Sequence, residues 1–408
     1  MLLELILALI FGILAGTITG LIPGIHVNLI TIIILSASST ILNLTPKLTL
    51  VIFIVSMAIT HTFVDYIPSI FLGAPDEDSF LSILPGHQFL LKGMAYHAII
   101  LTLYGSLIAL LVIFFSIPFF ILILPIIYPY IQKIMPLILI IISGFLIFEE
   151  KERKSWAMII FIFSGFLGLM TINLNLNQPL LPLLTGLFGA SNLIISINHK
   201  TKIPKQKIVS LKKIKLRKKS LIKSTFASLI AAPFTAFLPG LGASQAAIIG
   251  KEVTNIQDQR EFLFLLGAIN TIVMGLSFIT LYSINKSRTG ASVAVSQLIP
   301  SISASNLFLI ILTITFSGIV ASLITINLSK IIAKNIHKFS YSKISKTILI
   351  ILFIIIFCFS DSTLIGKLIA SLIFITSTAL GIFAISIKIK RIHLMGCLLI
   401  PTILFYLL

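Results

Sequence analysis

Two stretches of the sequence carry the same interruption of an apolar run. Residues 19–33 read TGLIPGIHVNLITII, and residues 235–249 read TAFLPGLGASQAAII. The threonine, the Pro-Gly pair and the final two isoleucines of the first stretch recur in the second, 216 positions later (239 minus 23). Proline removes one backbone N–H and glycine admits positive φ, so each Pro-Gly pair is expected to stop a helix.

The composition places these stretches in a membrane protein. Of the 408 residues, 58% are hydrophobic and only 10% are charged, whereas a soluble domain carries about 25% charged residues. A membrane-spanning helix needs roughly 20 apolar residues. The sequence therefore predicts an all-α, multi-pass protein of the cell membrane with about 10–12 transmembrane or re-entrant helical segments.

The net charge of +18 reflects topology rather than nucleic-acid binding, because the basic residues lie between apolar runs. Eleven Lys or Arg residues and no acidic residue occur between residues 200 and 223, which predicts a basic cytoplasmic linker at 198–223. The first cationic residue is Lys47, so the N-terminus is expected on the outer side. The only cysteines, Cys358 and Cys397, suggest neither a disulfide framework nor a thiolate metal site.

The linker divides the chain into a predicted N-terminal transmembrane repeat, 1–197, and a C-terminal transmembrane repeat, 224–408. Internal similarity of this kind is typical of transporters built from inverted repeats with discontinuous helices. A second, weaker match pairs Thr62 with Thr271. The sequence therefore predicts two inverted repeats, each interrupted at its Pro-Gly pair.

Three further apolar regions show how the spans are connected. Apolar runs flank residues 173–179 and residues 360–362, and each pair of runs is expected to form a hairpin whose tip is outside. The run 94–132 fits either two spans or one span bent at its prolines.

A helix broken partway across a membrane is tolerated where its backbone lines a protected or hydrated cavity. The N-terminus of a half-helix there offers N–H groups and a dipole that favour an anion. The predicted substrate-binding residues beside the breaks are Gly24, His26, Asn28, Gly240, Gly242 and Ser244. Two alternatives stay open: both Pro-Gly pairs lie in short loops between complete spans, and His26 is a buried histidine with a structural role.

Residues 60–97 contain eight ionisable residues in 38 positions, an unusual density for this chain. Ionisable groups at membrane depth are costly and usually functional. His61, Asp65 and Asp76 are predicted to serve ion coupling, with Na⁺ or H⁺ as the coupling ion. Asp65 lies in the apolar context TFVDYIPSIF, whereas Asp76, Glu77 and Asp78 also suit a helix N-terminus at the membrane surface.

Motifs for catalysis are absent from the sequence. It has no HExxH motif, no P-loop and no G-x-S-x-G motif, so neither an enzyme nor a catalytic, cofactor-binding or metal-binding residue is expected. The alternatives are a membrane-embedded enzyme or lipid-phosphate-handling protein that uses the acidic and histidine residues of 61–97, and a structural or sensor protein. Two breaks favour transport, because an enzyme needs only one polar cluster.

Four patches together resemble one family of membrane proteins. They are GTITGLIPGIHVNL (16–29), PSIFLGAPDEDSFLSILPGHQFLLKGMAYHAI (68–99), LLTGLFGASNLIISI (183–197) and FLPGLGASQAAIIG (237–250). The chain resembles the large membrane subunit of the tripartite tricarboxylate transporters, the TctA-like family. Pro75, in the second patch, is included among the predicted substrate-binding residues.

The resemblance implies a secondary transporter that is driven by a Na⁺ or H⁺ gradient. It implies a small organic anion as substrate, of the di- or tricarboxylate type, and a small membrane subunit and a solute-binding protein as partners. Three departures weaken the implied substrate more than the implied fold. In the second half, LSFITLYSINKSRTGAS (276–292) lacks the G-I-P-G-S motif of the family. The chain is shorter than typical members, and Asp76, Glu77 and Asp78 stand where the family usually has small neutral residues.

Overall fold

The computed structural model describes residues 2–22, 27–36, 42, 45–73, 83–150, 152–198, 203–238, 241–338 and 340–408. All regular secondary structure in these ranges is helical. They contain nine helices long and apolar enough to cross a membrane, and three shorter apolar helices. The prediction of an all-α, multi-pass membrane protein is confirmed.

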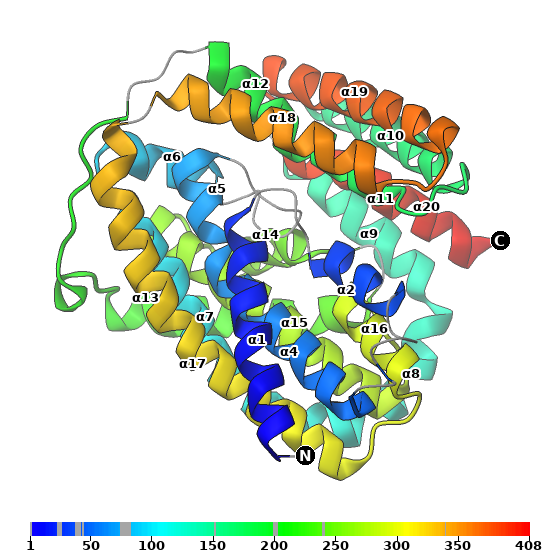
Figure 1. Ribbon diagram of the computed structural model, residues 1–408. Coiled ribbons are helices and arrows are strands. Elements are labelled where there is room, and N and C mark those ends of the chain that lie inside the picture. The colour runs from blue at the N-terminus through cyan, green and yellow to red at the C-terminus, as the bar shows by residue number, and fades with distance from the viewer. Residues whose placement is uncertain are drawn as a thin grey trace.

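The helices form two groups (Figure 1). The first group comprises α1 (Leu2–Leu21), α2 (Val27–Ser36), α4 (Lys47–Val64), α5 (Tyr66–Leu72), α6 (Ile83–Leu91), α7 (Ala95–Pro118), α8 (Leu124–Lys133), α13 (Lys218–Phe237), α14 (Ala243–Val253), α15 (Gln259–Ile284), α16 (Gly290–Leu298) and α17 (Ala304–Asn335). The second group, at the upper right of Figure 1, comprises α9 (Met135–Phe148), α10 (Lys154–Ile172), α11 (Leu180–Leu184), α12 (Ser191–Asn198), α18 (Tyr341–Phe359), α19 (Leu364–Ser386) and α20 (Gly396–Leu407).

Two helices form the centre of the first group. The most apolar stretches of α4 and α15 are each 94% buried, whereas that of α1 is 28% buried. α1 and α17 pack on α4, and α7 and α13 pack on α15. The two central helices are therefore covered by protein rather than by lipid.

α1 and α4 run parallel. A Cβ atom at Gly12 would collide with Ser56, and one at Gly20 would lie 2.8 Å from the Cβ of Val64. Both pairs are 44 residues apart (56 minus 12, 64 minus 20), so the two helices advance in the same direction. Small residues let membrane helices approach closely, because lipid offers no hydrophobic drive for their association.

α7 and α15 are also parallel, because Gly267 packs on Thr102 and Gly275 packs on Ile113. α7 begins beside α5 and α6, on the side where the α4–α5 run ends. It therefore returns antiparallel to α4, and α15 runs antiparallel to α4 as well. The two central helices thus have opposite orientations, as expected for inverted repeats.

Two parallel helices that follow each other in the chain, such as α1 and α4, require the segment between them to return across the membrane. α2 has ten residues, about 15 Å of helix, which is half of a bilayer core of about 30 Å. In the other half, Ser224 and Glu261 meet near the N-terminal ends of α13 and α15, so these helices are also parallel. The returning helix α14 packs along α13, with the Cβ position of Gly250 3.2 Å from the carbonyl oxygen of Ala227.

The helix boundaries repeat at the interval seen in the sequence. α1 spans residues 2–21 and α13 spans 218–237, and α2 and α14 begin at 27 and 243, so each boundary is displaced by 216. α6 and α16 are both nine residues long and 207 positions apart (290 minus 83). The repeat bounds 1–197 and 224–408 stay predictions, and α13 begins at Lys218, inside the predicted linker.

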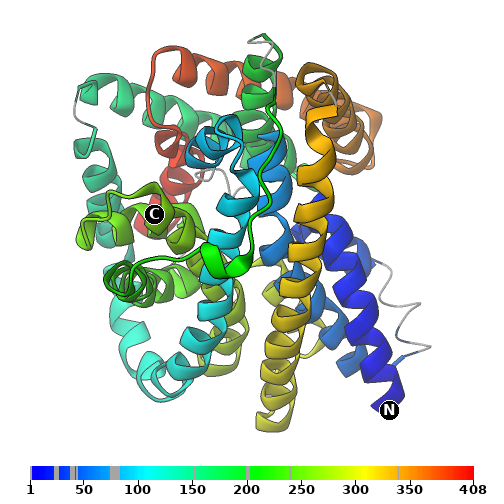
Figure 2. The ribbon, with the colours of Figure 1, turned by 90° about the vertical axis from the view of Figure 1, so that its left-hand side faces the viewer.

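The described part of the linker lies against the first group rather than standing free. Lys207 N–H donates to the carbonyl of Gly93 at 2.7 Å, and the amide of Ala95 donates to Gln206 Oε1 at 2.9 Å. Figure 2 shows the green linker crossing the cyan α7 on its way to α13. The linker thus contacts the start of α7 before the chain enters α13.

The run 94–132 is continuous in the structure. α7 ends at Pro118, a π-helical turn covers Phe119–Ile123, and α8 follows directly. The whole stretch Ala95–Lys133 has 39 residues, about 58 Å of helix, too long for a straight span. The proline and the π-helical turn provide a physical cause for a bend.

The tips of the two predicted hairpins meet in the second group. The amide of Gln178 donates to the carbonyl of Ser360 at 3.0 Å, and the amide of Asn177 donates to Asp361 Oδ2 at 3.2 Å. The tips therefore lie on the same side of the molecule, as expected.

Candidate functional site

Both Pro-Gly pairs fall between the end of one described helix and the start of the next. α1 ends at Leu21 and α2 begins at Val27, and α13 ends at Phe237 before α14 begins at Ala243. Five predicted site residues lie outside the described residues: Gly24, His26, Pro75, Asp76 and Gly240. Asn28 lies in the first turn of α2, but its side chain is outside the described part. The described helices are thus interrupted at both breaks.

The N-terminus of α14 is built from the residues that follow the second break. Gly242 N–H donates to Gln245 Oε1 at 2.7 Å, a capping bond that orients the first turn. Ser244 and Gln245 are fully buried. Among the described residues, Gln245 Nε2 has no hydrogen-bond partner. A buried donor without a partner costs free energy, which an acceptor arriving at this helix end would recover.

Two predicted coupling residues lie at the C-terminal end of α4, His61 within the helix and Asp65 directly after it. His61 Nδ1 is 3.0 Å from Thr19 Oγ1 of α1. The Thr19 hydroxyl also lies 3.1 Å from the carbonyl oxygen of Gly16, and the tautomer of the His61 ring decides which atom donates between His61 and Thr19. The histidine thereby ties α4 to the last turn of α1, directly before the first break.

Asp65 stands at the junction of α4 and α5. Pro68 has no N–H for the carbonyl of Val64, which weakens the helix there. The Asp65 side chain is only 3% exposed, and its Oδ2 accepts a hydrogen bond from Asn270 Nδ2 at 3.0 Å. A carboxylate from one half of the chain therefore meets an amide from the other half.

Between α1, α4 and α15 the polar side chains form one buried cluster, which we call the crossing cluster. Its members are Thr19, His61, Thr62, Asp65, Asn270 and Thr271, each at most 4% exposed. Buried polar groups in a membrane interior are expensive and usually functional. The cluster combines carboxylate, amide and hydroxyl oxygens with an imidazole, a set that suits a proton or a hard cation.

The comparison with protein families decides the class of protein. The model of the tripartite tricarboxylate transporter TctA family matches residues 6–396. This chain belongs to the TctA family. The resemblance seen in the four sequence patches is confirmed, and the protein is a component of a tricarboxylate transporter.

One curated relative is similar to this chain over most of its length. The uncharacterized protein MJ1079 of Methanocaldococcus jannaschii is 32% identical over 370 residues, which cover 87% of this chain and 88% of the relative. No solved structure matches.

Asn270 was missed in the sequence of this TctA-family protein. Its position in the sequence could have indicated it. Asn270 lies 209 residues after His61, and the same interval separates Thr62 from Thr271 (270 minus 61, 271 minus 62). A polar residue in an otherwise apolar run at the position equivalent to a candidate site residue deserves the same scrutiny as a charged one.

The segment 60–97 does not form a metal centre among the described residues, where no three His, Cys, Asp or Glu side chains could hold a metal ion. His97 stacks on Phe89 with ring centroids 6.1 Å apart, a packing role. Burial lowers the pKa of His87 on α6. Membership in a transporter family favours transport over the alternative of a membrane-embedded enzyme.

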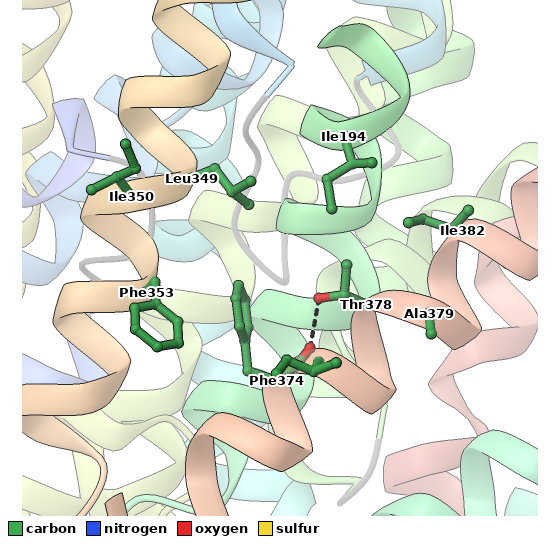
Figure 3. Close-up of a pocket in the computed structure, with 9 residues that line it drawn as sticks. Ile194, Leu349, Ile350, Phe353, Phe374, Thr378, Ala379 and Ile382 are labelled. Carbon is green, nitrogen blue, oxygen red and sulfur yellow. Dashed lines mark hydrogen bonds between the residues drawn. The ribbon is translucent and has the colours of Figure 1, made fainter. Parts of the chain in front are cut away.

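An apolar groove of about 490 Å³ lies elsewhere in the TctA-family chain, on α12, α18 and α19 (Figure 3). Its lining is aliphatic and aromatic apart from Thr378, whose hydroxyl donates to the carbonyl of Phe374 in its own helix. Such a lining offers no donor to a carboxylate. The groove suits the hydrocarbon of the bilayer and does not compete with the crossing cluster as a substrate site.

Proposed function

We infer that this TctA-family protein is an ion-gradient-coupled secondary transporter of a small organic anion of the di- or tricarboxylate type. The observation that carries this proposal is the pair of helix N-termini, α2 and α14, each following a Pro-Gly pair at the same interval of 216 residues. Discontinuous helices in corresponding positions are the best sequence pointer to a transporter's binding site.

The substrate is held by the backbone around Gly24 and Gly240, with Gly242, Asn28 and Ser244 beside it and with His26 and Pro75 as further contacts. Helix N-termini bind an anion without placing a bare cation in the membrane. The partnerless Nε2 of Gln245 supports a place for an acceptor at the start of α14. We expect glycine to be needed at the breaks, because it alone adopts positive φ freely and lets a ligand approach the backbone closely.

The coupling ion, Na⁺ or H⁺, is held by Asp65 with His61 in the crossing cluster, and Asp76 adds a second carboxylate to the ion path. Asp65 is supported by its burial and by its bond to Asn270 across the two halves. Because Asp65 and Asn270 belong to different halves of the chain, relative movement of the halves would change the surroundings of this bond. Such movement is the basis of alternating access in repeat-built transporters.

The partners follow from the family rather than from the site. TctA proteins work with a small membrane subunit and a solute-binding receptor, and we propose the same partners here. The receptor would deliver the anion to the outer side, where the N-terminus is expected.

The proposal is tested by uptake of labelled citrate and succinate into proteoliposomes, together with the purified partner subunits. Gly24→Val and Gly240→Val should each abolish uptake while the protein still elutes as a folded species. Gly144→Val is the matched control, since nothing lies within 4 Å of a Cβ built at Gly144. Each lost anion contact is expected to cost about 1.5–3 kcal/mol. Full uptake in both break variants would show that the Pro-Gly pairs are only loops.

A further inference from the structure

A polar cavity lies away from the crossing cluster, where the linker meets the N-terminal ends of α13 and α15. Its volume is about 440 Å³. The charged residues that line it are Lys215, Arg217, Lys223, Asp258, Arg260 and Glu261. We call it the linker pocket. Four basic and two acidic side chains give its wall an excess of two positive charges (four minus two).

Both acidic side chains already have partners inside the pocket. Glu261 Oε2 lies 3.9 Å from Lys223 Nζ, and the same ammonium donates to the carbonyl of Asn255 at 2.6 Å. Asp258 Oδ1 accepts the backbone N–H of Arg260 and caps α15. Glu261 is thus paired with Lys223, while Asp258 offsets one charge of the remaining three cations without forming an ion pair with any of them.

Three cations are left over. Within the part of the chain that the structure describes, no carboxylate lies within ion-pair distance of Lys215, Arg217 or Arg260. They stand at the beginnings of a 20-residue and a 26-residue helix, whose N-terminal dipoles are also positive. Like charges gathered at this point raise the free energy of the empty pocket, and an anion would lower it.

We propose that the linker pocket binds a phosphate-class anion. The arginines Arg217 and Arg260 suit phosphate, because a guanidinium donates two parallel hydrogen bonds to its oxygens. The volume holds a phosphate together with a further small group. The basic lining distinguishes this cavity from the apolar groove of Figure 3.

The surroundings favour a phospholipid headgroup over a free phosphate. The apolar side chains that follow the pocket on α13 are exposed, at 37% for Leu221, 66% for Ile222 and 54% for Phe226. A lipid with its phosphate in the pocket could lay its hydrocarbon chains along these residues. Basic pockets at the cytoplasmic ends of membrane helices are typical headgroup sites.

The position of the linker pocket gives its occupant a structural effect. Lys223 is on α13, Asn255 follows α14 and Glu261 is on α15, so the pocket joins the base of the α13–α14 pair to the next helix. An anion bound there would hold the linker, α13 and α15 together. Since it would bind only the folded protein, it should raise the temperature of unfolding.

The test compares full-length protein in nanodiscs of phosphatidylcholine alone with nanodiscs that also contain phosphatidylglycerol. The second lipid should raise the unfolding temperature, and native mass spectrometry should find it retained. Lys215→Gln with Arg217→Gln should weaken its retention by about tenfold or more, the loss expected for one hydrogen bond to a charged group. Arg260→Gln should act in the same direction.

The matched control is Lys212→Gln with Lys213→Gln, which removes two exposed charges of the same linker outside the pocket. It should keep the lipid effect. A parallel titration with inorganic pyrophosphate in detergent, at constant ionic strength, separates the two sources. A shift with pyrophosphate that the pocket variants lose would support the site and assign it to free phosphate compounds. Equal losses in pocket and control variants, or no shift with either probe, would overturn the proposal.

Discussion

The hydroxyl oxygens of Thr62 and Thr271 lie 3.1 Å apart where α4 crosses α15. These residues are matched, 209 positions apart, in the weak sequence alignment of the two predicted repeats. In a two-fold arrangement only residues near the axis touch their own counterparts. The same interval relates His61 to Asn270 and Asp65 to Met274. The chemistry at the crossing is therefore asymmetric, with both ionisable side chains contributed by the first half.

The Thr62–Thr271 contact should contribute a small, measurable coupling energy. The Thr62 hydroxyl also lies 2.9 Å from the carbonyl oxygen of Ile59, and either threonine can be the donor between the two hydroxyls. Thr62→Val and Thr271→Val preserve side-chain shape while removing the hydroxyls. A double-mutant cycle of unfolding free energies in detergent should give a coupling of about 0.6 kcal/mol, the average for membrane hydrogen bonds. Strictly additive effects would mean that the contact contributes nothing.

Asp65→Asn should separate ion coupling from substrate binding. The amide can still bond to Asn270, so the helix crossing is retained, but it cannot carry a proton or a charge. Uptake driven by a Na⁺ or H⁺ gradient should fall about tenfold or more, as expected for the loss of a charged ligand worth about 1.5–3 kcal/mol. Exchange of labelled for unlabelled citrate without a gradient should continue. If both activities fell equally, Asp65 would have no particular role in coupling.

Close packing of α1 on α4 makes Gly16 intolerant of a methyl group. A Cβ there would collide with the carbonyl oxygen of Met57 and lie 2.7 Å from the Cβ of Thr60. Gly16→Ala should lower the free energy of unfolding by about 1–3 kcal/mol, as overpacking does. Gly144→Ala should leave it unchanged or raised, because that site is open and alanine favours the helix. Thermal unfolding of both variants in one detergent decides the point.

Local sequence chemistry predicted the features that depend on local backbone. The Pro-Gly pairs gave both helix interruptions, and composition gave the membrane class, because these depend on a missing N–H and on apolar length. The pairing of helices was not predictable in this way. Gly12, for example, reads as an isolated weak point of a helix until α4 is placed against it.

In the candidate site, too, one residue could be predicted from the sequence and its partner could not. Asp65 stands out in the sequence because a charge in an apolar run is costly wherever it packs. Its partner Asn270 is 205 residues away (270 minus 65), and a neutral amide in an apolar run gives no comparable warning. The residues around Gly24 and Gly240 stay predictions, since they lie outside the described residues.

Asp361 should make the contact between the two hairpin tips depend on pH. Hydrogen bonds from the backbone and then the side chain of Thr363, followed by that of the Asn177 amide, hold its pKa below the ordinary value of 3.8. A lowered pKa in the folded state adds stability above the ordinary pKa, which is lost as the pH falls through the lowered value. Asp361→Asn should therefore melt below the wild type at neutral pH, and the two should converge in acid. Ser362→Ala, at the exposed neighbour, should follow the wild type at every pH.

The last prediction concerns the orientation of the whole chain. The linker carries eleven basic residues between 200 and 223, which predicts a cytoplasmic location, whereas the hairpin tips at Asn173 and Ser362 have no such cluster. Single cysteines at Asn173, Ser362 and Lys213, all exposed, can be added to a chain in which Cys358 and Cys397 are alanine. In intact cells an impermeant maleimide should label the two tip positions and spare Lys213→Cys. After permeabilisation all three should react, which controls for accessibility. Labelling of Lys213→Cys in intact cells would reverse the assigned orientation. It would also move the linker pocket to the outer leaflet, while the antiparallel packing of α4 and α15 would be unaffected.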